Sequence, residues 1–128
     1  MGDRGNIVMK QSDGEVWFYT HWTGSTIQQT LQKALIKGED RWKDEPYLAR
    51  IVFCTLVGKS TDSVTRFGIT TRITDNEHPI LVVDCPKQKI YLIKEEQLQD
   101  NRLPKDYNPD KTWSFEEFIK LKLDNTEE

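Results

Sequence analysis

The fold is decided by residues 7–20, IVMKQSDGEVWFYT, in which two runs of strand-forming residues flank the dipeptide Asp13-Gly14. An Asp-Gly pair supplies the positive φ angles of a two-residue hairpin turn, so we expect a tight β-hairpin here. A turn at these two residues places Ser12 opposite Glu15 and fixes the register. The pairs farther from the turn are then Met9–Phe18, Val8–Tyr19, Asn6–His21 and Arg4–Thr23.

Side chains alternate between the two faces of a strand, and this gives the hairpin a core face and a more polar face. The predicted core face carries Ile7, Met9, Val16, Phe18 and Thr20. The opposite face carries Arg4, Asn6, Val8, Tyr19 and His21. We therefore look for functional side chains on the second face.

Helical periodicity and turn signals predict the remaining elements. Helices are expected over 25–37, from Asp44 to about Leu56, and after Ser114, where Ser25–Gln28 and Ser114–Glu117 have the spacing of capping boxes. Strands are expected over 64–74, 80–84 and 90–94, and 95–111 is expected to be a surface excursion. The order ββααβββα predicts one α+β domain over residues 1–128, with a mostly antiparallel five-stranded sheet and the helices packed on one face.

Composition restricts the function classes. The chain has 128 residues, 18 Lys and Arg against 21 Asp and Glu, and a net charge of −3, which disfavours general nucleic-acid binding. No stretch of the sequence is long and apolar enough to cross a membrane, so we expect a cytoplasmic protein. The two cysteines, Cys54 and Cys85, are too few for a disulfide framework, and we expect both to be buried in apolar runs.

The hairpin is expected to bring Arg4, Asn6 and His21 beside the start of the first helix. A helix N-terminus has free N–H groups and roughly half a positive charge, so it attracts phosphate, sulfate or carboxylate. The alternative is that Gly24-Ser25 merely begins a helix, that His21 is a semi-buried side chain with its hydrogen bonds satisfied, and that Arg4 pairs with a nearby carboxylate. The predicted ligand-binding set is Arg4, Asn6, Tyr19, His21, Trp22, Ser25, Thr26, Trp42 and Arg50.

Arg50 belongs to this set because it is the one charge inside the apolar run of the second helix. Such an arginine snorkels outward, pairs with a carboxylate or faces a polar pocket. We predict that it holds the second helix to polar groups near the site.

The turn Asp75-Asn76-Glu77-His78-Pro79 offers carboxylates and an imidazole that suit divalent ions, with His21 as a further ligand if the two segments meet. The same residue types are also those that a turn requires for conformational reasons, and we favour that interpretation. The acidic neighbour of Cys85 disfavours a reactive thiol. Since phosphate loops, dinucleotide fingerprints and nucleophile elbows are absent from the sequence, we expect no cofactor.

Several segments resemble a group of small uncharacterised proteins encoded by bacteria and their phages. These segments are Gly2-Asp3-Arg4 with Asn6-Ile7, Tyr19-Thr20-His21-Trp22, Arg41-Trp42, Tyr47-Leu48-Ala49-Arg50-Ile51, Phe67-Gly68-Ile69 and Asp75-Asn76-Glu77-His78-Pro79. The resemblance implies a small accessory protein that sequesters a ligand or blocks a host partner. It brings no established activity and no functional residues with it.

Three functions are compatible with the sequence. The first is a non-catalytic binder of a small anionic ligand such as a nucleotide, with Arg4 on the phosphate and Trp22 or Trp42 stacked on a ring. The second is a protein-interaction module that blocks or recruits a host partner, with Trp42, Tyr47 and Trp113 as anchors. The third is a metal-assisted hydrolase, with His21 as base and Glu77 or Asp75 orienting it or holding a metal. We favour the first.

Overall fold

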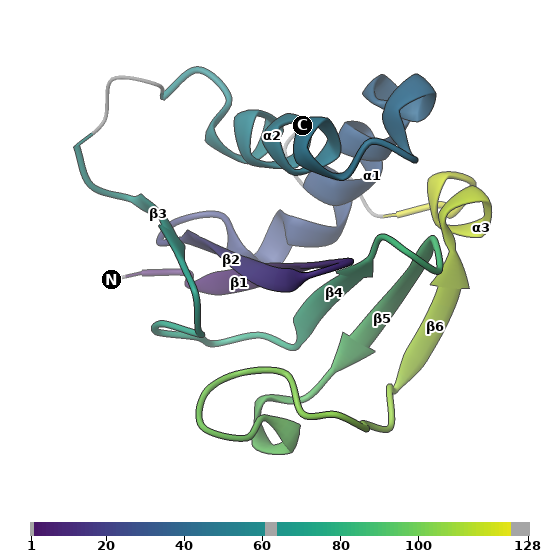
Figure 1. The fold of residues 1–128 in the computed structure, drawn as a ribbon. Helices are drawn as coiled ribbons and strands as arrows, with labels where there is room; N and C mark the ends of the chain where they lie inside the picture. The colour runs from purple at the N-terminus through teal and green to yellow at the C-terminus, as the bar shows by residue number, and fades with distance from the viewer. Residues whose placement is uncertain (1, 61–63, 124–128) are drawn as a thin grey trace.

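The computed structural model describes residues 2–60 and 64–123. Within these residues the chain forms one six-stranded sheet, in the order β3-β2-β1-β4-β5-β6, with three α-helices (Figure 1). The predicted α+β class is confirmed. The strands are β1 Gly5–Gln11, β2 Gly14–Thr20, β3 Phe67–Thr70, β4 Ile80–Asp84, β5 Lys89–Ile93 and β6 Lys111–Ser114, and the helices are α1 Ile27–Lys37, α2 Glu45–Val57 and α3 Phe115–Ile119.

The sheet differs from the predicted five-stranded one in two respects. First, β1 pairs with β4 in parallel, with Ile7 beside Leu81, so the sheet is mixed. Second, a sixth strand, β6, pairs with β5 and places Trp113 opposite Ile90. This strand is only four residues long and lies at the sheet edge, so its sequence has little of the alternation that marks a strand. The expected surface excursion therefore ends in a strand.

The hairpin forms, but its predicted register is wrong by two residues. Gln11 pairs with Gly14, which leaves Ser12 and Asp13 as the turn, and Asn6 pairs with Tyr19 instead of His21. Gly14 is not among the described residues with a positive φ angle. The carboxylate of Glu45, at the start of α2, accepts hydrogen bonds from the backbone N–H of Ser12 at 2.8 Å and from its hydroxyl at 2.7 Å. This contact holds Ser12 in the turn.

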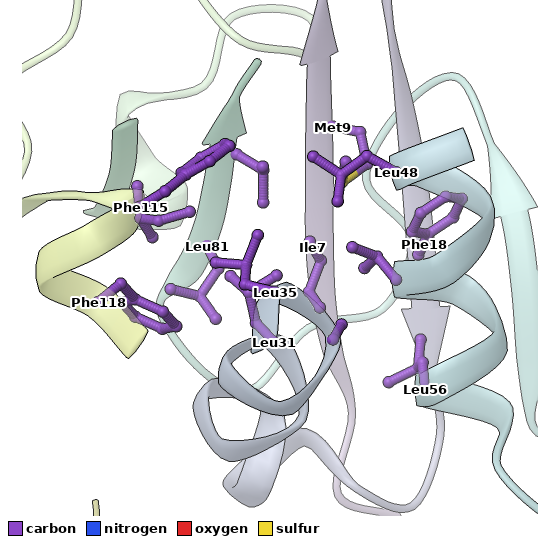
Figure 2. Close-up of a cluster of buried hydrophobic side chains, with 14 of the residues drawn as sticks. Ile7, Met9, Phe18, Leu31, Leu35, Leu48, Leu56, Leu81, Phe115 and Phe118 are labelled. Atoms are coloured by element: carbon purple, nitrogen blue, oxygen red, sulfur yellow. The ribbon is translucent and has the colours of Figure 1, made fainter. Parts of the chain in front are cut away.

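The three helices cover one face of the sheet and bury the larger core (Figure 2). Side chains from β1, β2, β4 and β5 point into this core. Those of the hairpin, Ile7, Met9, Val16 and Phe18, lie on the face that its alternation predicted. The helices contribute residues at helical spacing, and α3 begins with the predicted capping box between Ser114 and Glu117. The central members of this core are Ile7, Met9, Phe18, Leu31, Leu35, Leu48, Leu56, Leu81, Phe115 and Phe118.

The second face of the sheet is also buried. Val8 and Trp17 have no exposed surface there, and the partly buried Leu98, Leu103 and Tyr107 pack against this second cluster. The segment between β5 and β6 thus covers the sheet instead of extending into solvent. Polar side chains on this face lie at both ends of the hairpin, with Asn6 and Tyr19 at the open end and Lys10 and Glu15 beside the turn.

Two further expectations fail. The strand predicted over 64–74 is reduced to β3, and Ile69 is 60% exposed. Cys54 is exposed on α2, whereas Cys85 is buried as expected. No helix in the described part of the chain has the length and apolar character needed to span a membrane.

Candidate functional site

The candidate site lies where the N-terminal residues meet the start of the first helix. The backbone N–H of Asp3 donates to the carbonyl of His21 at 2.7 Å, and the N–H of Gly24 donates to the carbonyl of Asp3 at 2.7 Å. One oxygen of the Asp3 carboxylate then accepts hydrogen bonds from the N–H of Ser25 at 3.0 Å and from its hydroxyl at 2.6 Å. The protein's own carboxylate therefore occupies the N-terminus that we predicted for a ligand.

This contact corrects the predicted roles of Ser25 and Thr26. A short 3-10 helix, Gly24–Thr26, precedes α1, and Thr26 is the N-cap residue of α1 without a side-chain capping bond. The backbone N–H of Thr26 donates to the carbonyl of Thr23 at 3.2 Å. The expected capping box between Ser25 and Gln28 is therefore not formed, because Asp3 takes the Ser25 hydroxyl.

The second oxygen of Asp3 contacts His78 Nε2 at 2.5 Å. The pKa of Asp3 is lowered, mainly by the hydroxyl of Ser25; burial opposes this as the next-largest effect, and His78 and the Ser25 N–H lower the pKa further. Gly24 is required beneath this pair, since a Cβ atom at that position would lie 2.6 Å from His78 Cδ2. Asp3, Ser25 and His78 form what we call the Asp3 clamp. The Asp3 carboxylate lies between the Ser25 hydroxyl and the His78 imidazole. The clamp therefore lacks the hydroxyl–imidazole contact that activates a serine nucleophile.

Asn6 is fully buried, and its side chain makes hydrogen bonds within the fold. Its amide nitrogen donates to the carbonyl of Asp75 at 3.0 Å and to Asn76 Oδ1 at 3.1 Å. These bonds hold the turn before β4 against β1. The sequence predicted that Asn6 lies opposite His21. Asn6 instead lies opposite Tyr19, and the hydroxyl of Tyr19 contacts His21.

Arg4, Tyr19, His21 and Trp22, which we call the Arg4 cluster, come together at the open end of the hairpin. The hydroxyl of Tyr19 is 2.8 Å from His21 Nδ1. The ring of His21 is perpendicular to that of Trp22, with centroids 4.5 Å apart, and Trp22 is 47% exposed. A Cβ atom on Gly2 would lie 3.1 Å from both Arg4 Nε and His21 Nε2, so these two nitrogens lie close to the same point.

The Arg4 guanidinium has no carboxylate partner among the described residues. Its backbone is held by Glu77, whose side chain accepts from the Arg4 N–H at 2.8 Å and whose own N–H donates to the Arg4 carbonyl at 3.0 Å. The Nε atom is buried and has no acceptor in the described structure. The predicted alternative, in which Arg4 pairs with a carboxylate, is therefore not formed.

Charges around the Tyr19 hydroxyl are of both signs. Burial raises the pKa of Tyr19 most, and the nearby carboxylates of Asp75 and Glu77 raise it further, whereas the charge of Arg4 lowers it. The site thus carries a cation and two carboxylates within electrostatic reach of one hydroxyl.

The other predicted ligand-binding residues lie elsewhere. Trp42 donates from Nε1 to the carbonyl of Leu35 at 3.0 Å and meets Phe115 edge to face, so it belongs to the core. Arg50 is exposed on α2, beside a separate hollow lined by Lys37, Ile51, Cys54 and Thr55. Its expected role in tying α2 to the site is wrong, because α2 turns this side chain outward, where water solvates the charge.

The residues proposed for a hydrolase do not assemble. Within residues 2–60 and 64–123, no three His, Cys, Asp or Glu side chains are grouped as metal ligands. His21 Nδ1 faces Tyr19 rather than Asp75 or Glu77, and Glu77 is bonded to the Arg4 backbone. Burial raises the pKa of Cys85 to about 12, which leaves it a thiol at neutral pH.

The expected aromatic anchors for a protein partner are not exposed together. Trp42 and Trp113 are partly buried against the helical core, and Trp113 meets Phe118 with ring centroids 5.2 Å apart. Tyr47 is 55% exposed, and the guanidinium carbon of Arg41 lies over its ring, 5.3 Å from the centroid.

Sequence reasoning missed Asp3 and His78 as partners, and with them a cleft of about 360 Å³ beside the clamp. The sequence gives no sign of the parallel pairing of β1 with β4. This pairing places the turn before β4 beside the N-terminal residues. The cleft is lined by Gly24, Ser25, Ile27, Gln28, Gln29, His78, Pro79, Leu92 and Leu123.

No protein-family model matches this sequence, and neither the curated proteins nor the solved structures show significant similarity to it.

Proposed function

We propose that this protein binds a small anionic ligand through the Arg4 cluster without transforming it chemically. The observation that carries the proposal is the buried Nε of Arg4, which has no acceptor among the described residues. A buried donor left without a hydrogen bond costs about 1–3 kcal/mol, and proteins rarely leave one unmatched. Because Nε is enclosed, an anionic oxygen can accept from it only if the residues around Arg4, Gly2 among them, shift on binding, and that hydrogen bond would remove this cost.

The geometry favours an anion over a neutral acceptor. Arg4 carries a full charge that no described carboxylate pairs with, and His21 Nε2 lies close to the same point as Arg4 Nε. A guanidinium presents several donors in a fixed fork that matches a phosphate or a carboxylate. The proposed anion site is therefore centred on Arg4 and His21, and the amides of Ser25 and Thr26 take no part in it.

A phosphate attached to an aromatic ring suits the cluster better than free phosphate. Trp22 stands next to His21, and almost half of its surface is open to solvent. A base stacked on an aromatic side chain contributes about 1–3 kcal/mol, which a free anion lacks. A nucleotide is accordingly the ligand class that we favour, and an accessory role in sequestering such a ligand remains a prediction.

The test is a thermal-shift series with inorganic phosphate, ribose 5-phosphate and AMP. A ligand that binds only the folded state adds about 2.7 kcal/mol to the free energy of unfolding at 100 times its dissociation constant. We expect all three to raise the melting temperature, with AMP most effective at equal concentration. Arg4→Met should remove most of each shift, and Trp22→Ala should reduce the AMP shift to that of ribose 5-phosphate.

The matched control is Arg50→Met, which removes the same charge from an exposed position on α2. It should leave every ligand-induced shift unchanged. The proposal is wrong if no phosphate compound shifts the melting temperature at millimolar concentration, or if Arg4→Met and Arg50→Met behave alike.

A further inference from the structure

The edge strand β3 carries the strongest feature outside the Arg4 cluster. In the order β3-β2-β1-β4-β5-β6 its one strand neighbour among the described residues is β2, so its other side pairs with no strand in that part of the chain. Sheet edges are commonly blunted by charge, proline or a covering segment, because an open edge pairs readily with another strand. The four residues of β3, Phe67-Gly68-Ile69-Thr70, contain neither a charge nor a proline.

The alternation of hydrogen-bonded and non-bonded residue pairs shows which backbone groups of β3 point away from β2. The N–H of His21 donates to the carbonyl of Arg66 at 2.7 Å, which makes this pair a bonded rung one step beyond Thr20–Phe67. Bonded and non-bonded pairs alternate in an antiparallel ladder, so Gly68 and Thr70 bond to β2. The backbone N–H and C=O groups of Phe67 and Ile69 therefore face away from the sheet. They have no backbone partner among the described residues.

Side chains at this edge add an apolar contact and a charge pattern. Ile69 is 60% exposed, and exposed arginines flank the strand at positions 66 and 72. From these observations we propose that β3 is a docking edge for an extended, acidic segment of a partner protein, which adds to the sheet as a seventh strand. The open backbone groups bind its main chain, Ile69 packs against an apolar side chain, and the two arginines pair with acidic residues at its ends.

A second copy of this chain fits the edge less well. An antiparallel two-fold pairing that packs Ile69 against its own copy brings Arg66, just before β3, to the same end of the pair as Arg72 of the other copy, twice over. Like charges at the same end of a strand pair repel each other. The same arginines favour an acidic segment, so the charge pattern selects between these two occupants.

The probe is a capped peptide, Asp-Val-Thr-Val-Thr-Val-Asp, in which the acidic ends are spaced to match positions 66 and 72. Its counterpart has lysine at both ends. Titration followed by amide chemical shifts and hydrogen exchange should protect the Phe67 and Ile69 amides on addition of the acidic peptide. The Gly68 and Thr70 amides should already be protected in the free protein. The lysine peptide should bind at least ten-fold more weakly at low salt.

Ile69→Pro is the decisive variant, because it removes an outward N–H that β2 does not use, and proline is tolerated at such edge positions. This variant should abolish peptide binding and leave the thermal shift caused by inorganic phosphate unchanged. The two measurements therefore test the docking edge and the anion site separately. Ile69→Val keeps the N–H and should still bind. The proposal is overturned if Ile69→Pro binds the acidic peptide normally, if both peptides bind equally, or if sedimentation shows β3-dependent self-association instead.

Discussion

The carboxylate of Asp3 accepts two hydrogen bonds from Ser25, one from its backbone N–H and one from its hydroxyl. An internal anion thus satisfies the first free amide ahead of α1, where an N-terminus would otherwise attract a ligand. For the proposed function, this means that the anion would bind at Arg4 and not at this N-terminus. The consequence for stability is a dependence on pH.

Asp3→Asn should destabilise the protein at neutral pH by about 1 kcal/mol, the usual scale of a helix-capping or helix-dipole contact at a partly exposed position. The pKa of Asp3 is lower in the folded state than its ordinary value of 3.8, so the stabilising effect is complete above that value and is lost as the pH falls through the folded-state pKa. Urea denaturation of both proteins between pH 7 and pH 2.5 measures this. A difference that stays constant down to pH 2.5 would contradict the assignment.

Gly24→Ala should destabilise the protein by about 1–3 kcal/mol, the typical cost of forcing extra atoms into a packed site. The new Cβ would meet His78 Cδ2 at 2.6 Å and the carbonyl oxygen of Asp3 at 2.8 Å. Gly14→Ala is the matched control, because nothing lies within 4 Å of its Cβ position. Thermal denaturation should show a loss for the first variant and little change for the second. Equal melting temperatures of the two variants would mean that the Asp3 clamp accommodates the added methyl group without loss of stability.

Asn6→Asp should destabilise the protein by at least about 1–3 kcal/mol, since it replaces a buried donor with an oxygen that faces two acceptors. Those acceptors are the carbonyl of Asp75 and Asn76 Oδ1. Thr74→Val removes a single 3.5 Å contact to the other side of the Asn6 amide and should cost much less. Urea unfolding midpoints compare the two. If both variants lose the same stability, Asn6 does not hold the turn through its amide nitrogen.

Much of the fold was predictable because it rests on local signals. The periodicity of Leu31 and Leu35, the proline at the start of α2 and the capping box at Ser114 each identify a helix within a few residues. The hairpin register was not predictable from alternation. A shift of two residues keeps every side chain on its face, and long-range contacts such as the hydrogen bonds that Ser12 donates to Glu45 accompany the observed turn.

The candidate site was predictable only in part for the same physical reason. Arg4, Tyr19 and His21 come together because they share one hairpin, and a local argument suffices for them. Asp3 and His78 are 75 positions apart in the sequence and meet through the parallel β1–β4 ladder. A parallel pairing leaves no turn signature in the sequence, so the internal anion that fills the predicted helix site could not be foreseen.

The two cysteines should react very differently with an alkylating reagent. Cys54 is exposed on α2, whereas Cys85 is buried and its pKa is raised to about 12, mainly by burial. Since the thiolate is the nucleophile, iodoacetamide at pH 8 should modify one cysteine in the native protein and both in urea. Mass spectrometry of Cys54→Ser, which should show no native modification, is the control. Rapid native labelling of that variant would mean that Cys85 opens to solvent.

The central position of β1 in the sheet has a consequence for the nascent chain. β1 is synthesised before β4, and one of its two edges stays open until residues 80–84 have been synthesised and can pair with it. During that interval the nascent hairpin exposes Val8 and Met9, which are fully buried in the finished sheet. Open apolar edges favour aggregation. We expect ribosome-released chains that end before Ile80 to aggregate and chains that extend through α3 to stay in solution, which a sedimentation assay of truncated translation products would measure.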